Sequence, residues 1–155
     1  MKIKKDDKIY IIGIKGVGVS MLAQFLTGKG YEVSGSDTDE VFMTDKVLAS
    51  CGVKVHQGFS ESNLPPKDHV IIYSTAYNEK TNVEFRRAKE EGFKMFSFPE
   101  ALGMFFNEFF GIAIAGSHGK TTTTAWLGYV LMKSGLDPNV MVGANVYQLG
   151  GCSVN

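Results

Sequence analysis

The sequence predicts an α/β fold built on a parallel sheet. Three observations support this fold class. Short apolar segments alternate with amphipathic stretches along the chain. Several apolar segments, such as residues 69–74, are continuous rather than alternating, which is typical of strands covered on both faces. Two glycine-rich turns each follow an apolar segment and open an amphipathic stretch, so we expect parallel strands joined by right-handed crossovers.

The first part of the chain contains five predicted strands. They cover residues 8–13, 31–36, 53–56, 69–74 and 94–97. Apolar spacing predicts helices over residues 17–29, 42–50, 83–91 and 99–107. Glycines end the first helix, Asn82 is an N-cap for the third, and Pro99 suits the first position of the fourth. We therefore expect residues 1–107 to form a Rossmann-like domain.

A second unit is predicted to begin near Asn107. It contains a strand at 112–115, a glycine-rich turn at 116–120, a helix at 121–134 and a strand at 140–142. The helix is expected to turn Trp126, Leu127, Val130 and Leu131 inward. Residues 108–155 are too few for a complete α/β nucleotide-binding domain. We interpret them as the beginning of a P-loop ATP-binding domain, truncated by the end of the chain.

Composition excludes some partners. The chain has 16 basic and 16 acidic residues, which gives no reason to expect nucleic acid or an anionic membrane as a partner. No apolar segment approaches the ~18 residues of a membrane span, and no signal peptide is visible. Cys51 and Cys152 are far apart and form no CxxC pair, so we expect neither a disulfide nor zinc. A cytoplasmic protein is predicted, and its oligomeric state is left open.

The second glycine-rich turn, Ala115–Thr122 (AGSHGKTT), favours phosphate binding. Its glycines allow backbone N–H groups to surround phosphate oxygens at the N-terminus of a helix. Lys120 would reach the β- and γ-phosphates as a point charge, and the Thr121 hydroxyl would bind Mg²⁺. The spacing is G-x-x-G-K-T, shorter than the usual G-x-x-x-x-G-K-[ST], because Ile114 stands at the first glycine position. The alternative is a structural turn with an exposed lysine.

The first turn, residues 13–20 (GIKGVGVS), has the spacing G-x-x-G-x-G. Asp37 ends the second predicted strand 19 residues after Gly18, about where an acid meets a ribose hydroxyl in dinucleotide-binding folds. We interpret the turn as a site for a nucleotide pyrophosphate, the alternative being a tight turn that uses glycine for geometry only.

Ser74 and Thr75 follow the fourth predicted strand at the carboxyl edge of the sheet. Open α/β folds bind ligands at this edge, where these hydroxyls could contact phosphate or sugar. Loop capping is an equally good reading of the two residues.

The tandem turns, about 100 residues apart, resemble the Mur ligase family. The strings that carry the resemblance are IGI at 12–14, GVGVS at 16–20, VSGSD at 33–37, STA at 74–76 and AGSHGKTTTT at 115–124. Gly143-Ala144-Asn145 and Gly150-Gly151 are similar to the glycine-rich segment that follows in that family. The histidine before GK and the four threonines favour the branch that adds L-alanine, or its relative that recycles murein tripeptide. The resemblance covers essentially all 155 residues.

The resemblance implies an ATP-dependent ligase with divided tasks. The first domain would hold UDP-N-acetylmuramate, and the second would bind ATP and Mg²⁺ to activate the sugar's lactyl carboxylate as an acyl phosphate. The amine of L-alanine would then attack this intermediate. The implied UDP-sugar residues are Gly13, Gly16, Gly18, Ser20, Asp37, Ser74 and Thr75. The implied ATP residues are Gly116, Ser117, His118, Gly119, Lys120, Thr121 and Thr122, with Lys120 and Thr121 catalytic and Thr121 on the metal.

Departures from the family leave alternatives open. Lys15 stands where the family usually has glycine, so the first turn is either stiffer or carries an extra cation for the pyrophosphate. Gln57-Gly58-Phe59 replaces the usual Gly-His, which affects the expected recognition of uracil. The family's acidic Mg²⁺ motif and C-terminal domain are not in this sequence, so we expect nucleotide binding without complete ligation. A non-catalytic UDP-sugar-binding module and an NAD(P)-dependent oxidoreductase with an incidental GKT are the competing hypotheses.

Overall fold

The computed structural model describes residues 3–144 and residue 146. The chain divides into two compact units, residues 1–109 and 110–155. The predictions for Cys152, Asn145 and Gly150-Gly151 fall outside the described residues.

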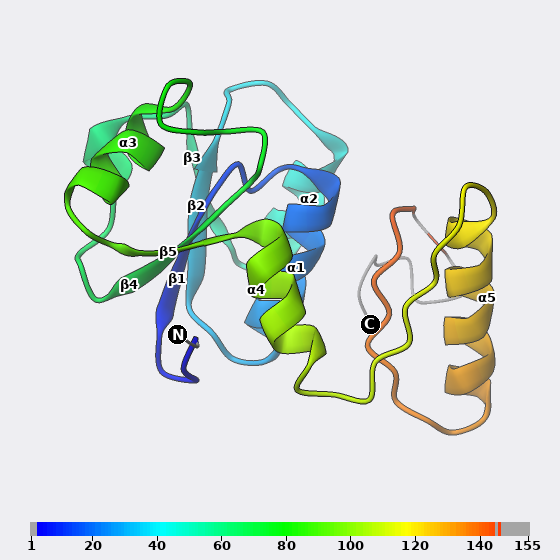
Figure 1. Cartoon of the computed structure of the whole chain (residues 1–155). Helices are drawn as coiled ribbons and strands as arrows, with labels where there is room; N and C mark the ends of the chain where they lie inside the picture. Colours follow the sequence, from blue (N-terminus) through cyan, green and yellow to red (C-terminus); the bar gives the residue numbers. More distant parts are fainter. Residues whose placement is uncertain (1–2, 145, 147–155) are drawn as a thin grey trace. The chain divides into compact units, whose positions relative to one another are not determined.

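The first unit is an α/β domain with a five-stranded, all-parallel sheet (Figure 1). Its strands are β1 (Lys8–Ile12), β2 (Val33–Asp37), β3 (Lys54–Gln57), β4 (His69–Tyr73) and β5 (Lys94–Ser97). They lie in the order β3-β2-β1-β4-β5, and each neighbouring pair is parallel. This confirms the predicted parallel sheet and all five strands of this part, with shifts of one or two residues at their ends.

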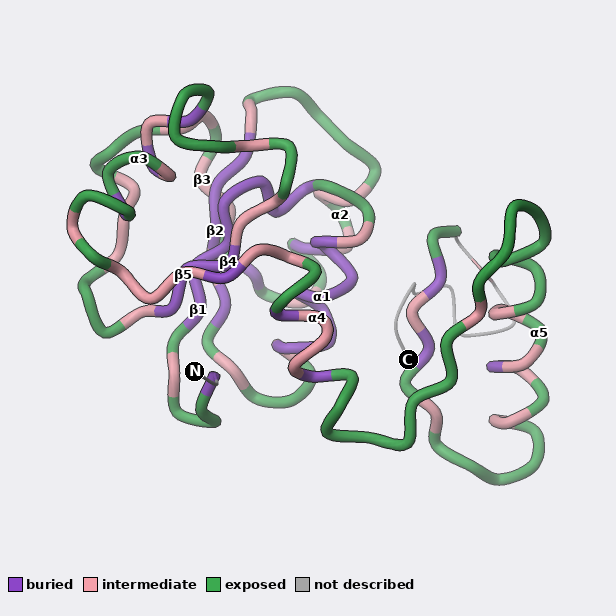
Figure 2. The backbone as a smooth tube through the Cα atoms, viewed as in Figure 1, coloured by how far each residue is buried: buried purple, intermediate pink, exposed green. Residues whose placement is uncertain are grey.

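Helices cover both faces of this sheet. They are α1 (Val17–Gly28), α2 (Met43–Ser50), α3 (Val83–Glu90) and α4 (Phe98–Phe106), with a short 3₁₀ helix, η1 (Glu61–Asn63). Helices α1, α2 and α4 lie on one side and α3 on the other (Figure 1). The central strand is buried because it is covered on both faces, and Ile9, Ile11 and Ile12 are fully inaccessible (Figure 2).

The second unit contains the helix α5 (Lys120–Lys133). The predicted strands at 112–115 and 140–142 were wrong, because neither segment belongs to a strand among the described residues. A strand exists only where its backbone groups pair with a neighbouring strand, whereas Val140 and Val142 pack by their side chains in a small core with residues of α5.

The buried face of α5 also differs from the prediction. Trp126 is 71% exposed and Val130 is 49% exposed, so these two residues do not face inward as expected. The face that packs on Val140 is centred on Gly128, where an added methyl group would lie 2.7 Å from a Val140 methyl carbon. Small size at position 128, rather than apolar character alone, therefore decides which side of α5 is covered.

No helix within residues 3–144 is long and apolar enough to cross a membrane.

Candidate functional site

The first candidate site lies where the strand order reverses. From β1 the chain moves outward through β2 to β3, then returns to the other side of β1 to form β4 and β5. The register aligns the carboxyl ends, because Ile12 of β1 pairs with Ser36 of β2 and with Tyr73 of β4. The predicted residues Gly13 and Ser74 therefore follow adjacent strand ends. Ligands of open α/β sheets bind in the crevice outside such a switch point.

Two glycines of the first turn are required by the protein itself. Gly13 has φ +81°, and an added methyl group would lie 2.6 Å from the Tyr77 ring and 2.8 Å from Cβ of Ser74. A methyl group on Gly18 would lie 3.0 Å from the Phe98 ring. Both positions need glycine for conformation or close packing, whether or not a ligand is present.

Gly16 is different, because nothing in the protein requires a glycine there. Its φ is −56°, and an added methyl group would have no neighbour closer than 3.7 Å. Gly16 is exposed and is the N-cap of α1, where no side chain caps the helix and no acidic residue occupies the first turn. The first N–H groups of a helix lack intrahelical acceptors and carry partial positive charge. Bare backbone at position 16 thus leaves room for an anion to approach these groups.

Ser20 and Asp37 use their polar groups within the turn. Ser20 is buried, and its hydroxyl donates to the carbonyl of Val17 at 2.9 Å. The Asp37 carboxylate accepts hydrogen bonds from the N–H groups of Lys15 at 2.7 Å and Thr38 at 2.8 Å. These contacts shape the turn and the end of β2, and they occupy groups that were predicted to serve the ligand.

The Asp37 carboxylate also accepts from the Tyr77 hydroxyl at 3.3 Å. Burial raises the pKa of Tyr77, and the neighbouring charge of Asp37 raises it further. Tyr77 therefore stays protonated as a donor that joins the segment after β4 to the end of β2.

The two predicted residues after β4 differ in their surroundings. The N–H of Ser74 donates to the carbonyl of Ile12 at 2.9 Å, and its own carbonyl accepts from the N–H of Tyr77 at 3.0 Å. Ser74 is therefore part of the turn structure, whereas Thr75 is exposed at the carboxyl edge.

Lys15, for which the sequence left two alternatives open, is buried in the structure. Its side chain is only 1% exposed. The ammonium donates to the carbonyls of Thr38 at 2.8 Å and Glu40 at 2.7 Å, and to the side-chain oxygen of Gln57 at 2.7 Å. It also forms an ion pair with Asp45 at 3.2 Å. Of the two alternatives for Lys15, this geometry favours the stiffer turn over an extra cation for the pyrophosphate.

Glu84 is a second buried charge that was missed. It is completely inaccessible, and its carboxylate accepts hydrogen bonds from the hydroxyls of Tyr10 and Ser36, the N–H of Ser60 and the amide of Asn63. These donors satisfy the buried carboxylate and connect α3 to β1, β2 and the loop after β3. No local signal marks this glutamate, which reads as a solvent-facing residue of a short helix.

The second candidate site is the turn before α5. Gly119 has φ +78° and is the N-cap of the helix, a left-handed conformation that glycine adopts without strain. The Lys120 ammonium folds back and donates to the carbonyls of Gly116 at 2.6 Å and Ser117 at 3.4 Å. The residues predicted to bind ATP, 116–122, are all exposed.

This turn offers groups that suit a phosphate. It offers the first N–H groups of α5, a lysine ammonium and the hydroxyl of Thr121 at one helix end. Residues 3–144 contain no group of three or more His, Cys, Asp or Glu side chains that could hold a metal.

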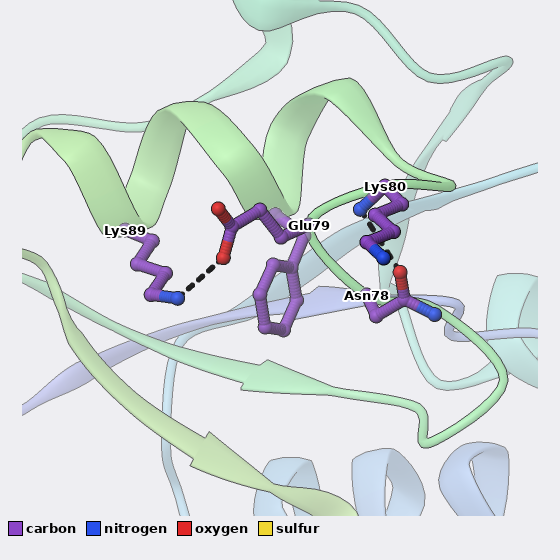
Figure 3. Close-up of a pocket in the computed structure, with 5 residues that line it drawn as sticks. Asn78, Glu79, Lys80 and Lys89 are labelled. Atoms are coloured by element: carbon purple, nitrogen blue, oxygen red, sulfur yellow. Dashed lines mark hydrogen bonds and ion pairs between the residues drawn. The ribbon is translucent and has the colours of Figure 1, made fainter.

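A shallow depression of about 530 Å³ lies beside α3 (Figure 3). It is lined by Asn78, Glu79, Lys80, Phe85 and Lys89. Its polar groups are matched internally, because Lys89 pairs with Glu79 and the N–H of Lys80 donates to the Asn78 side chain at 2.9 Å. None of the predicted site residues lines this depression, and we assign no ligand to it.

Comparison with known proteins places the chain among ligases. The sequence profile described as "Mur ligase family, catalytic domain" matches residues 8–110. The UDP-N-acetylmuramate–L-alanine ligase of Borreliella burgdorferi is 44% identical over 151 residues, covering 94% of this chain and 32% of that protein. The corresponding ligase of Treponema pallidum is 45% identical over 139 residues, covering 90% of this chain and 29% of that protein.

Solved structures agree with these relatives. The UDP-N-acetylmuramate–alanine ligase of Thermotoga maritima has a TM-score of 0.85 and 26% identity, covering 95% of this chain and 34% of that one. A murein peptide ligase of Psychrobacter arcticus has a TM-score of 0.82 and 27% identity, covering 96% and 33%. The chain thus spans about a third of the length of the curated relatives it matches. Its profile match, its sequence relatives and its parallel sheet agree, and the chain belongs to the Mur ligase family.

Proposed function

We propose that this chain is the nucleotide-handling part of an ATP-dependent ligase of peptidoglycan precursor synthesis, which joins L-alanine to UDP-N-acetylmuramate. The observation that carries the proposal is the uncapped start of α1 at Gly16, which follows β1 at the switch point and leaves room for an anion to approach. The relatives that match nearly the whole chain bear the name of this ligase, which supports the choice of substrates.

In this proposal the first unit holds the UDP moiety. The N–H groups at the start of α1 bind the pyrophosphate, and Gly16 lets it approach the backbone closely. Thr75 supplies an exposed hydroxyl from the neighbouring strand end. Gly13 and Gly18 fix the turn, while Ser20 and Asp37 support its shape rather than contact the phosphates directly.

The second unit would bind ATP with Mg²⁺ through residues 116–122. Bound ATP supplies the phosphoryl group that converts the lactyl carboxylate into an acyl phosphate, from which the amine of L-alanine displaces phosphate. Lys120 would exchange its contacts with the Gly116 and Ser117 carbonyls for phosphate oxygens, so that its charge offsets the charge of the transferred group. Thr121 would hold the metal ion from the first turn of α5.

A ligase that recycles murein peptide is the second candidate. The murein peptide ligase of P. arcticus is nearly as similar in structure as the alanine ligase of T. maritima, with TM-scores of 0.82 and 0.85. Full-length protein assayed with L-alanine and with murein tripeptide would separate the two candidates, because only one amine should be consumed efficiently.

The first test is calorimetric titration of the chain with UDP-N-acetylmuramate, NAD⁺ and Mg·ATP separately. We expect binding of the UDP-sugar and none of NAD⁺. Binding of NAD⁺ instead of the UDP-sugar would refute the proposal in favour of an oxidoreductase. An ATP signal that disappears in Lys120→Ala would support the second site.

A variant at Gly16 tests the proposed contact. Gly16→Ala introduces a methyl group whose nearest neighbour in the protein would be 3.7 Å away, but which would occupy the approach of the pyrophosphate. We expect at least a tenfold loss of UDP-sugar affinity, or about 1.4 kcal/mol, with thermal stability changed by no more than the effect of a weaker N-cap. Gly28→Ala, in open space at the other end of α1, is the matched control and should bind normally.

A further inference from the structure

We propose that Lys15 is a positioning residue for the nucleoside end of the ligand. Its buried ammonium fixes residues 38–45 next to the end of β2 before the ligand arrives, and it does not contact the pyrophosphate. The inference rests on the proposed UDP-sugar site and concerns a residue of its first glycine-rich turn.

The first argument is that the ammonium has no capacity left for a phosphate. An ammonium has three N–H donors, and that of Lys15 makes three hydrogen bonds of 2.7–2.8 Å, with Asp45 as its charged partner. The side chain is 1% exposed. Contact with a ligand would require breaking these bonds and leaving three buried or half-buried oxygen atoms without their donor, which is costly.

The second argument is that Lys15 joins the first turn to the segment after β2 through its backbone as well. Its N–H donates to the Asp37 carboxylate at 2.7 Å, and its carbonyl accepts from the Thr44 hydroxyl at 2.7 Å. The whole residue therefore bridges the turn after β1, the end of β2 and the start of α2.

The third argument is that apolar burial contributes little to holding this segment. Val41 is 92% exposed, Met43 is 88% exposed and Phe42 is 40% exposed. Because hydrophobic stabilisation scales with the apolar area removed from water, polar contacts must fix the segment. The partly buried contacts of the Lys15 ammonium with the Thr38 and Glu40 carbonyls are among them.

The fourth argument concerns the place of the segment. It begins at Thr38, directly after the carboxyl end of β2. Strand β2 lies next to β1, and β1 is followed by the uncapped start of α1. A nucleotide whose pyrophosphate lies at Gly16 would extend its nucleoside along this edge of the sheet. The Thr38 hydroxyl oxygen is buried without a hydrogen-bond partner in the protein, and such a group in a folded protein requires an explanation. Because this oxygen is almost inaccessible from solvent, it belongs to the packed start of the segment and does not face a ligand.

The expected consequence is a change in the population of the binding-competent segment. If residues 38–45 are in place only a fraction of the time, the apparent dissociation constant rises by the inverse of that fraction. Removing the ammonium should therefore weaken UDP-sugar binding even though the lysine makes no contact with the ligand.

The experiment compares wild type, Lys15→Met and the control Lys46→Met, an exposed lysine of the adjacent helix. Hydrogen exchange of the unliganded chain measures the mobility of residues 38–45, and calorimetry measures the dissociation constant for UDP-N-acetylmuramate at several salt concentrations. For Lys15→Met we expect at least tenfold faster exchange in 38–45, about tenfold weaker binding, and a salt dependence equal to that of wild type. Asp45→Asn should shift both quantities in the same direction by less, and it tests the inference if Lys15→Met does not fold.

The outcomes separate this inference from the proposed function. Unchanged affinity in a folded Lys15→Met, or a reduced salt dependence of binding, would overturn the positioning role and in the second case indicate a direct phosphate contact. Absence of UDP-sugar binding by the wild-type chain would instead overturn the proposed function, and this inference with it.

Discussion

Replacing Glu84 should show how a buried carboxylate holds the first unit together. Its four hydrogen-bond donors differ in what they can do when the carboxylate is changed. The hydroxyls of Tyr10 and Ser36 can rotate and become acceptors, whereas the N–H of Ser60 and the amide of Asn63 can only donate from their present positions. The structure therefore predicts different costs for Glu84→Gln and Glu84→Ala.

In Glu84→Gln the amide oxygen can face Ser60 and Asn63, while the amide nitrogen donates to the two rotated hydroxyls. All four contacts survive without the charge, so we expect a loss of about 0.5–1.5 kcal/mol in the free energy of unfolding. Glu84→Ala leaves two buried hydroxyls without an acceptor, and each such group costs about 1–3 kcal/mol. The expected loss is about 2–6 kcal/mol, with Ser60 and Asn63 adding little because water can reach their half-buried surroundings.

Urea denaturation followed by far-ultraviolet circular dichroism measures these differences. Glu90→Gln, an exposed glutamate of the same helix, is the control and should change the free energy of unfolding by less than about 0.5 kcal/mol. The reasoning fails if Glu84→Gln is as destabilising as Glu84→Ala, or if Glu84→Ala costs no more than the control.

Three further predictions concern other contacts of the first unit. Gly13→Ala should lose about 2–5 kcal/mol of stability in urea titrations, because it combines a left-handed residue with a methyl group 2.6 Å from the Tyr77 ring; stability equal to wild type would contradict this. Ser97→Ala should lose about 1 kcal/mol, because Ser97 and Glu100 form a reciprocal capping box at the start of α4, and an unchanged thermal midpoint would argue against it. Burial raises the pKa of both Tyr10 and Tyr77. Because the pKa is higher in the folded state, the contribution of each tyrosine to stability is complete below the pKa of the unfolded state, near 10. This contribution is lost as the pH rises through the folded-state pKa. Absorbance titration should show that both tyrosines ionise at higher pH than free tyrosine. If the wild type contained no late-titrating tyrosine, and its titration curve therefore had the same shape as that of Tyr10→Phe, this prediction would be wrong.

The first unit was predictable from the sequence because its elements are locally consistent. The apolar run at residues 69–74 is typical of a covered strand, and the structure has a strand there. Asn82 and Pro99 marked helix starts that the structure confirms. Glycine spacing located the turn after β1. It did not show that packing requires a glycine at position 13, whereas a side chain at position 16 would meet no close neighbour. That distinction depends on residues distant in sequence.

The errors and omissions have a common physical origin in long-range partners. Lys15 and Glu84 look like surface residues in any local pattern, and their burial depends on hydrogen-bond partners 21 to 74 positions away. The segment 140–142 is apolar enough for a strand, but among the described residues it packs against a helix instead of pairing with a strand. Trp126 was expected inside because it is apolar, yet the close approach of Val140 to Gly128 selects another face.

The exposure of Trp126 makes the second unit directly observable by spectroscopy. It is the single tryptophan of the chain and lies on α5, about 9 Å along the helix axis from Lys120. Its indole is largely in contact with water, so its emission should be red-shifted and readily quenched by iodide. Selective excitation of this one side chain would therefore follow events at the glycine-rich turn before α5 without interference from the five-stranded domain, whose aromatic residues are tyrosines and phenylalanines.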